Sequence, residues 1–306
     1  MATNLWVVVP ALNEAENLVI VVPGIVAELA LLDVDGHVLV VDDGSTDKTR
    51  EVMIDLAERH GGVEVISLGR NQGKAPALKQ GFERALSEGA EIVVMMDADG
   101  QDDPSELALL LARLDDGADL VTGARTIRND RYVKRNTSRL YNGATARLSG
   151  VPGKDFNSGF KVMRADVARH ASPMLYGELH RYLTVVAHWL GFRVAEVTVQ
   201  HHERLHGTTK YGLARFWRGF VDLVTVRFLM TYESRPSHLF SGIGLASLTA
   251  GGLALAYLLV ERLSGEAIGG RPLLITGVVL VLGGLQLVLF GLLAELVVYS
   301  RHRGRA

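Results

Sequence analysis

Short apolar runs recur along the chain as far as Tyr232, and each is followed by a polar turn and a longer segment of mixed composition. Their length and their content of β-branched residues are typical of buried strands. The predicted strands are Leu5 to Pro10, His37 to Val41, Val63 to Leu68 and Glu91 to Met96. Two further strands are expected after a tight turn that begins at Asp155 and over residues 193–199.

Segments of helical character separate these strands. The first of these helices starts at Asn13, which we expect to be its N-cap. The others cover residues 48–60, 75–87 and 178–190. Strands that alternate with helices predict an α/β fold with a mostly parallel sheet and helices on both faces. Ligands of such folds bind beyond the carboxyl ends of the strands. The polar turns at residues 10–14, 42–47 and 97–101 are therefore expected to meet there.

The pattern changes beyond Tyr232, where two long segments carry no charge, Leu239 to Val260 and Leu273 to Ala294. Each spans about 33 Å as a helix, whereas the hydrocarbon core of a bilayer is about 30 Å thick. Buried core helices of a soluble protein are the alternative, but neither segment has a polar face. The sequence therefore predicts two transmembrane helices.

Positive charge is concentrated on the outer flanks of these helices, at Arg235 and over residues 301–305, while the connecting loop carries both signs. By the positive-inside rule, both chain ends are expected in the cytoplasm. We predict a cytosolic soluble domain over residues 1–210, a juxtamembrane amphipathic helix over 211–235 and a transmembrane hairpin with a short cytosolic tail over 236–306. The protein would then be an integral membrane protein whose soluble domain lies on the cytoplasmic face.

Composition and the absence of known motifs exclude several classes of site and partner. The chain of 306 residues contains no cysteine, which excludes disulfides and thiolate metal sites. Neither the G-x-G-x-x-G nor the G-x-x-x-x-G-K-[ST] pattern occurs, so dinucleotide-binding and P-loop functions lose their main support. Nucleic acid is an unfavourable partner, because the sequence has two predicted membrane spans and no basic stretch studded with aromatic residues. The sequence leaves homo-oligomerisation open.

Carboxylates follow the fourth predicted strand directly. Asp97 and Asp99 flank one small residue, and Gln101 comes two positions later. Carboxylate and amide oxygens at the carboxyl end of a strand are suitable ligands for a divalent cation that carries a diphosphate. An acidic surface loop is the alternative interpretation of the same residues.

Two basic stretches follow this acidic one along the chain. Residues 125–154 are rich in Arg and Lys and contain a single acidic residue, Asp130. They predict either a solvated helix face or attraction of anionic headgroups or phosphate. In the second stretch, Arg204 and Lys210 are two cations that can converge on a phosphate. Residues 202–206 also match H-E-x-x-H, the zinc peptidase pattern, but they lie between a strand pattern and a Gly-Thr-Thr turn instead of on a helix.

These motifs together resemble glycosyltransferase family 2, the inverting enzymes of the GT-A fold. The residues that carry the resemblance are 7–14, 41–47, Asn71-x-Gly73-Lys74, Asp97-Ala98-Asp99-Gly100-Gln101 and Asn157-Ser158-Gly159-Phe160. The segment Arg204-x-x-Gly207-x-Thr209-Lys210-Tyr211, followed by an amphipathic helix and two spans, is similar to the polyprenyl-phosphate glycosyltransferases of that family. The resemblance covers nearly the whole chain.

The resemblance implies transfer of a sugar from a UDP- or GDP-sugar to dolichyl or undecaprenyl phosphate, with Mg²⁺ or Mn²⁺ as cofactor. The implied nucleotide-sugar residues are Pro10, Leu12, Glu14, Asp42, Asp43, Lys74 and Asp97. The implied metal ligands are Asp97, Asp99 and Gln101, and Asp99, Arg125 and Arg135 are implied near the reacting phosphates. Arg204 and Lys210 are implied to hold the acceptor phosphate.

Three alternatives remain at this point. A family 2 enzyme with another acceptor, such as a processive polysaccharide synthase, shares the domain, but the Gln-x-x-Arg-Trp motif and additional spans of those enzymes are absent. A membrane-anchored zinc peptidase would use His202, Glu203 and His206. A non-catalytic anchor would bind nucleotide sugars without turnover.

Overall fold

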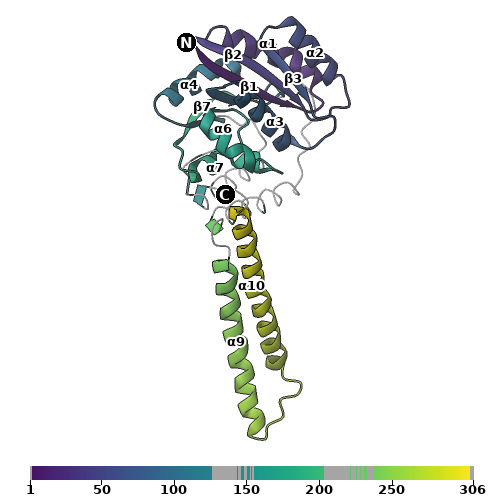
Figure 1. The fold of residues 1–306 in the computed structure, drawn as a ribbon, viewed down its shortest axis with the longest axis vertical. Coiled ribbons are helices and arrows are strands. Elements are labelled where there is room, and N and C mark those ends of the chain that lie inside the picture. The colour runs from purple at the N-terminus through teal and green to yellow at the C-terminus, as the bar shows by residue number, and fades with distance from the viewer. Residues whose placement is uncertain are drawn as a thin grey trace. The chain divides into compact units, whose positions relative to one another are not determined.

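The computed structural model describes residues 2–125, 143, 146–147, 150–151, 153, 155–202, 221, 225, 228, 231–232 and 237–303. The chain divides into two compact units, Met1–Val226 and Arg227–Ala306 (Figure 1). The first unit contains a sheet with helices on both faces, and the second is a pair of long helices. The predicted helix over residues 211–235 falls almost entirely outside the described residues.

A seven-stranded sheet forms the first unit, with strand order β3-β2-β1-β4-β6-β5-β7. The strands are β1 (Thr3–Ala11), β2 (Val34–Asp42), β3 (Val63–Ser67), β4 (Ile92–Met95), β5 (Leu120–Arg125), β6 (Lys161–Arg164) and β7 (Val194–Val199). Neighbouring strands are parallel except on either side of β6, which runs antiparallel to β4 and β5. The prediction of a mostly parallel sheet is confirmed.

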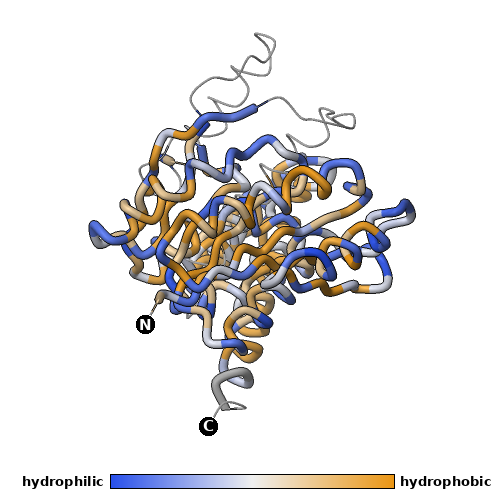
Figure 2. The backbone as a smooth tube through the Cα atoms, turned by 90° about the horizontal axis from the view of Figure 1, so that it is seen from above, coloured by the Kyte–Doolittle hydropathy of each residue, from blue (hydrophilic) through white to orange (hydrophobic). Residues whose placement is uncertain are grey.

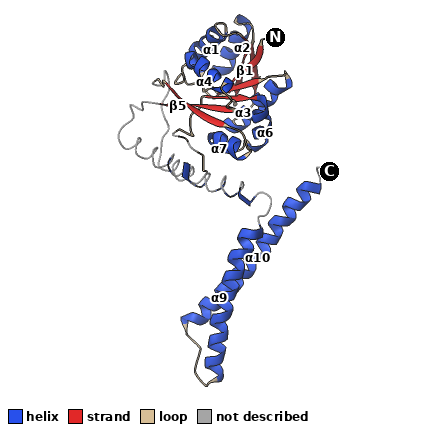
Figure 3. Ribbon diagram, turned by 90° about the vertical axis from the view of Figure 1, so that its left-hand side faces the viewer, coloured by secondary structure: helices blue, strands red, loops and turns tan. Residues whose placement is uncertain are grey.

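Helices cover both faces of this sheet (Figure 3). They are α1 (Ala15–Leu29), α2 (Thr49–Arg59), α3 (Lys74–Ser87), α4 (Leu107–Asp115), α6 (Ala165–Ala171) and α7 (Leu183–Trp189), with short 3-10 helices at Pro104–Glu106, Ser172–Met174 and Leu179–Tyr182. Alternate residues of β1 explain the two layers, since Val7 packs in the core beneath α1 while Val8 faces α3. The central strands are apolar and the outer loops polar in Figure 2.

Sequence patterns missed some elements. Strand β5 was not predicted, and Asn13 is not the N-cap that its residue type suggested. Helix α1 begins at Ala15, after Glu14 at the N-cap, and Asn13 has a left-handed backbone with φ of 58°. An Asn tolerates this conformation better than most residues, because its short side chain bonds to nearby backbone groups.

The second unit consists of α9 (Ser237–Leu263) and α10 (Pro272–Arg303), which contain the two predicted apolar segments. Both helices are long and apolar enough to cross a membrane. They pack closely at glycines, because a Cβ atom at Gly244 would lie 2.7 Å from the Gly284 oxygen and one at Gly251 would lie 2.8 Å from the Gly277 oxygen. Small residues at such contacts let two helix backbones approach each other in a membrane.

Candidate active site at the carboxyl edge of the sheet

A pocket opens where β1, β2 and β4 end, as expected for an α/β fold. Its lining comes from the loops after these strands and from the start of α3. The lining residues are Pro10, Ala11, Leu12, Glu14, Asp43, Asn71, Gly73, Lys74, Asp97, Ala98 and Asp99. Of the residues predicted for the nucleotide sugar, only Asp42 is outside this lining, and the predicted site residues Gln101 and Arg125 are also outside it.

Hydrogen bonds tie the first two loops of the pocket together. The backbone N–H of Asn13 donates to Ser45 Oγ at 2.9 Å, and the N–H of Thr46 donates to Asn13 Oδ1 at 2.9 Å. The N–H of Glu14 donates to Thr49 Oγ1, also at 2.9 Å. The left-handed backbone of Asn13 is thus held by two partners on the neighbouring loop, which fixes the pocket wall on the β1 side.

Two consecutive carboxylates organise the opposite wall. Buried Asp43 accepts hydrogen bonds from the backbone N–H groups of Gln72 and Gly73 at 2.7 and 2.8 Å. Buried Asp42 accepts from the Ser45 N–H at 2.8 Å and from Ser67 Oγ at 2.9 Å. Asp42 therefore supports the loops from behind, whereas Asp43 both supports them and reaches the pocket.

Lys74 and Asp97 form an ion pair on the floor of the pocket. Burial raises the pKa of Asp97, but the Lys74 ammonium and its hydrogen bond hold that pKa below the ordinary value. Asp97 is therefore ionised at neutral pH. The pair joins the start of α3 to the loop after β4. Both of its residues were predicted to bind the nucleotide sugar.

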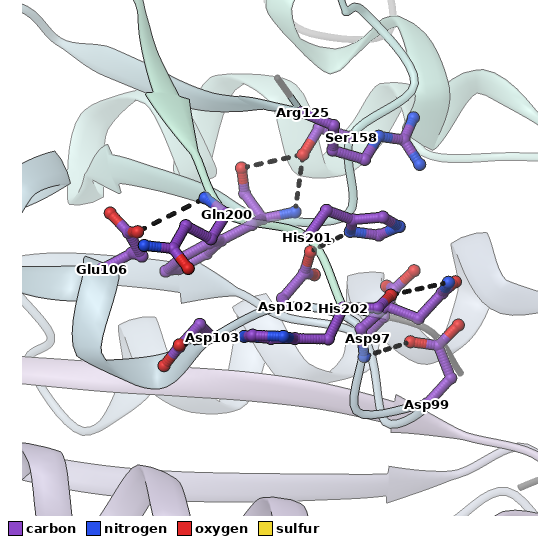
Figure 4. Close-up of polar contacts among 12 residues, drawn as sticks. Asp97, Asp99, Asp102, Asp103, Glu106, Arg125, Ser158, Gln200, His201 and His202 are labelled. Carbon is purple, nitrogen blue, oxygen red and sulfur yellow. Dashed lines mark hydrogen bonds and ion pairs between the residues drawn. The ribbon is translucent and has the colours of Figure 1, made fainter. Parts of the chain in front are cut away.

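Asp99, labelled in Figure 4, continues the acidic turn, and Gln101 follows it two positions later. The Gln101 N–H donates to Asp99 Oδ1 at 3.2 Å. Asp97, Asp99 and Gln101 thus place two carboxylates and one amide on a single turn, which suits the hard oxygen preference of Mg²⁺ or Mn²⁺. No group of three or more His, Asp or Glu side chains is arranged to hold a metal within the described part of the chain. The turn of Asp97, Asp99 and Gln101 therefore fits a cation that takes its remaining ligands from a diphosphate.

The same turn is bonded to the end of β7, a contact that the sequence patterns did not reveal. The His202 N–H donates to the Gln101 carbonyl at 2.9 Å, and Asp102 and His201 form a short antiparallel bridge. The ring of His202 lies 3.1 Å from Asp103 through Nε2 (Figure 4). A ring nitrogen bonded to Asp103 gives no support to the zinc peptidase alternative, whose other residues, Glu203 and His206, lie outside the described residues.

Arg125 ends β5 and is held by Asp155. The guanidinium donates through Nε to Asp155 Oδ2 at 2.5 Å and through Nη2 to Oδ1 at 2.8 Å. The two side chains are only 13% and 8% exposed. Sequence reasoning selected Arg125 but missed Asp155, although Asp155 directly precedes the Phe-Asn-Ser-Gly-Phe motif. The remaining predicted cations, Arg135, Arg204 and Lys210, lie outside the described residues.

His180 is a further buried titratable group near Asp97 and Lys74, and sequence reasoning did not select it. The residue is 7% exposed, and its Nδ1 has no hydrogen-bond partner among the described residues. Burial, reinforced by the Lys74 and Arg181 charges, lowers the pKa of His180 to about 3. The imidazole is therefore neutral at physiological pH and contributes no positive charge to the site.

The neutrality of His180 predicts a specific acid sensitivity. Lowering the pH from 7 to 5 should destabilise the wild-type protein by about 2 kcal/mol more than His180→Gln. The folded-state pKa of about 3 is below the ordinary 6.5, so in this interval the unfolded chain binds a proton that the folded chain does not. This stability is present above about pH 6.5 and is lost as the pH falls toward 3. Thermal unfolding of both proteins in detergent measures it, and identical pH dependence would contradict it.

The chain is similar in sequence to known glycosyltransferases. The glycosyl transferase family 2 model matches residues 6–171. A dodecaprenyl-phosphate galacturonate synthase of Rhizobium johnstonii is 32% identical over 99% of this chain and 90% of its own. An undecaprenyl-phosphate 4-deoxy-4-formamido-L-arabinose transferase of Pseudomonas paraeruginosa is 33% identical over 98% of this chain and 87% of its own.

Solved structures give the same fold. Glucosyl-3-phosphoglycerate synthase of Mycobacterium tuberculosis, in complex with Mn²⁺ and UDP-glucose, matches with a TM-score of 0.55 and 25% identity over 74% of this chain and 79% of its own. A mannosyltransferase of Pyrobaculum calidifontis, in complex with GDP-Man and Mn²⁺, has a TM-score of 0.53 and 19% identity over 76% and 65% of the two chains. The predicted GT-A fold is confirmed. The chain belongs to glycosyl transferase family 2 and is a glycosyltransferase, similar over almost its whole length to polyprenyl-phosphate sugar transferases.

Proposed function

We propose that this protein transfers a sugar from a nucleotide-diphosphate sugar to a polyprenyl phosphate, with inversion at the anomeric carbon and dependence on Mg²⁺ or Mn²⁺. The pocket at the carboxyl edge of the sheet carries the proposal, because it combines nucleotide-side loops with the Asp97 and Asp99 carboxylates. The relatives named for dodecaprenyl and undecaprenyl phosphate support the acceptor class.

On the donor side, residues of the described pocket would hold the nucleotide. Pro10, Leu12 and Glu14 form one wall and Asp43 the other, on loops that hydrogen bonds fix in place. Asp97, Asp99 and Gln101 would bind the divalent cation, which when bound stabilises the negative charge that builds on the departing diphosphate. Lys74, the ion-pair partner of Asp97, would add positive charge beside the same leaving group.

On the acceptor side, the lipid phosphate needs binding more than activation. The second pKa of a phosphomonoester is about 6, so the attacking oxygen is largely anionic at neutral pH and needs no general base. We assign Arg204 and Lys210, with Arg125 and Arg135, to holding this anion against repulsion from the donor phosphates. Attack in line with the departing diphosphate inverts the anomeric centre.

The two long helices give the proposed location. We propose that α9 and α10 anchor the enzyme in the membrane with both chain ends in the cytoplasm, because Arg235 and the residues after 300 supply positive charge on the outer flanks. Residues 1–210 would be the catalytic domain, 211–235 a helix in the headgroup layer and 236–306 the anchor. Lipid acceptor and enzyme would then share one bilayer.

A screen of nucleotide sugars tests the proposed reaction. The full-length protein is incubated with UDP- and GDP-sugars, Mn²⁺ and a mixed polyprenyl-phosphate extract, and the lipids are analysed by mass spectrometry. We expect one glycosylated polyprenyl phosphate to form and to disappear when EDTA is added. Turnover of a donor in EDTA, or the appearance of sugar on a non-phosphorylated acceptor only, would refute the proposal.

Lys210→Ala separates donor from acceptor binding. We expect the KM for the lipid phosphate to rise by about 10-fold, the effect of losing one charge-assisted contact, while the KM for the nucleotide sugar stays nearly constant. Lys79→Ala, at an exposed position of α3, is the control. A larger effect on the donor KM than on the acceptor KM would show that Lys210 serves the other substrate.

A further inference from the structure

Lys161 is a charged residue at the start of β6, an inner strand of the sheet. It is completely buried and lies on β6 opposite Met95 of β4 and Thr122 of β5. Its strand neighbours Val162 and Met163 and the preceding Phe160 are apolar and fully buried. Burial lowers the pKa of its ammonium to about 8. A charge in such a place costs stability, whereas an apolar side chain of similar volume would not.

The ammonium is bonded to the loop that precedes β6. Lys161 Nζ donates to the Ser158 carbonyl oxygen and, at 3.4 Å, to the Phe156 carbonyl oxygen. Ser158 also closes the loop on itself, because its Oγ accepts the Phe160 N–H at 3.2 Å. Residues 155–160, which we name the 155–160 loop, are thus attached to the sheet through the side chain of Lys161.

Each end of the 155–160 loop touches one of the two ion pairs of the site. At its start, the Asp155 carboxylate binds the Arg125 guanidinium. Near its end, Gly159 packs against Asp97, the partner of Lys74, and a Cβ atom at Gly159 would lie 2.5 Å from Asp97 Cγ. A glycine is required there because the loop backbone lies directly against the carboxylate. The loop therefore spans the distance between Asp97 and Arg125.

We propose that Lys161 is a positioning residue, which holds the 155–160 loop so that Asp97 and Arg125 keep a fixed separation during sugar transfer. The inference rests on the proposed function. Lys161 touches the loop carbonyls, and its effect on the reaction passes through Gly159 to Asp97 and through Asp155 to Arg125. This role explains why a buried cation occupies a strand position that otherwise suits an apolar residue.

Lys161→Met tests this role in the full-length enzyme, with Lys79→Met, an exposed lysine of α3, as the matched control. We expect kcat to fall about 10- to 100-fold, the range for losing hydrogen bonds from a charged group. The number of Mn²⁺ ions bound per protein at saturating Mn²⁺ with UDP or GDP present, counted by electron paramagnetic resonance, reports the folded fraction and should stay at the wild-type value. A fall in kcat that only matches a fall in this number would indicate misfolding alone and overturn the proposal. Unchanged kcat would overturn it as well.

Gly159→Ala tests the positioning of the 155–160 loop if Lys161→Met does not fold. With Lys161 in place, the loop cannot retreat from the added methyl group, so Asp97 must move, and we expect kcat and Mn²⁺ affinity both to fall at least about 10-fold. Wild-type kcat and Mn²⁺ affinity for this variant would show that the loop moves away from the added methyl group, which overturns the proposal. Absence of turnover by the wild-type enzyme in the same assay would instead contradict the proposed function.

Discussion

Asp99→Ala should lower sugar transfer by about 100- to 1000-fold, the size of effect seen when a group that stabilises developing charge is removed. Asp99 lines the pocket beside Asp97 and shares its turn with Gln101. Because Asp99 would supply one of the carboxylate ligands of the cation, its removal should also weaken cation binding. Steady-state turnover at increasing Mn²⁺ concentrations, together with Mn²⁺ binding, measures both effects.

Asp116→Ala is the control for this substitution, since Asp116 is an exposed carboxylate that pairs with Arg113 on α4. It should leave turnover and Mn²⁺ binding at wild-type values. The thermal unfolding of Asp99→Ala should also match that of the wild type, because Asp99 is not a core residue. Full activity of Asp99→Ala would refute the assignment of the metal site.

Asp155→Ala should destabilise the protein by about 3 kcal/mol, because it leaves a buried guanidinium without its bidentate partner. For a domain of this size, that loss lowers the melting temperature by about 6 to 12 °C. Turnover should fall as well, since Arg125 loses the contact that fixes its direction. Thermal unfolding in detergent and the kcat of the folded fraction are the measurements.

Asp166→Ala provides a surface comparison for Asp155→Ala. Asp166 also pairs with an arginine, Arg169, but both side chains are more than half exposed. Such a pair contributes about 0 to 1 kcal/mol, so the melting temperature should hardly change. Equal effects of the two substitutions would show that the Arg125 and Asp155 pair is no more important than a surface contact.

The sequence predicted the parts of the fold in which pattern and burial coincide. The inner parts of β1, β2 and β4 are buried on both faces, so residues 5–9, 38–41 and 92–95 read as unbroken apolar runs. Strand β5 escaped notice because Thr122 and Gly123 interrupt its apolar residues. Asn13 was misassigned because its bond to Thr46, 33 positions away, outweighs local preference.

The same limit separates the site residues that the sequence predicted from those that it missed. Asp97, Asp99 and the pocket residues lie at strand ends, where α/β topology alone places ligands. Asp155, Lys161 and His180 could not be found in this way, since nothing in the spacing of a charged residue says which distant group it meets. Their roles depend on burial and on partners from other elements, which only the folded chain provides.

The reversed direction of β6 decides where the two ends of one chain segment meet. Because β6 runs opposite to β5, the chain leaves the ligand edge at Arg125 and returns to the same edge at Asp155. The ion pair between these two residues joins the end of β5 to the start of the 155–160 loop. The position of the Arg125 guanidinium therefore depends on the loop that leads into β6 as well as on its own strand.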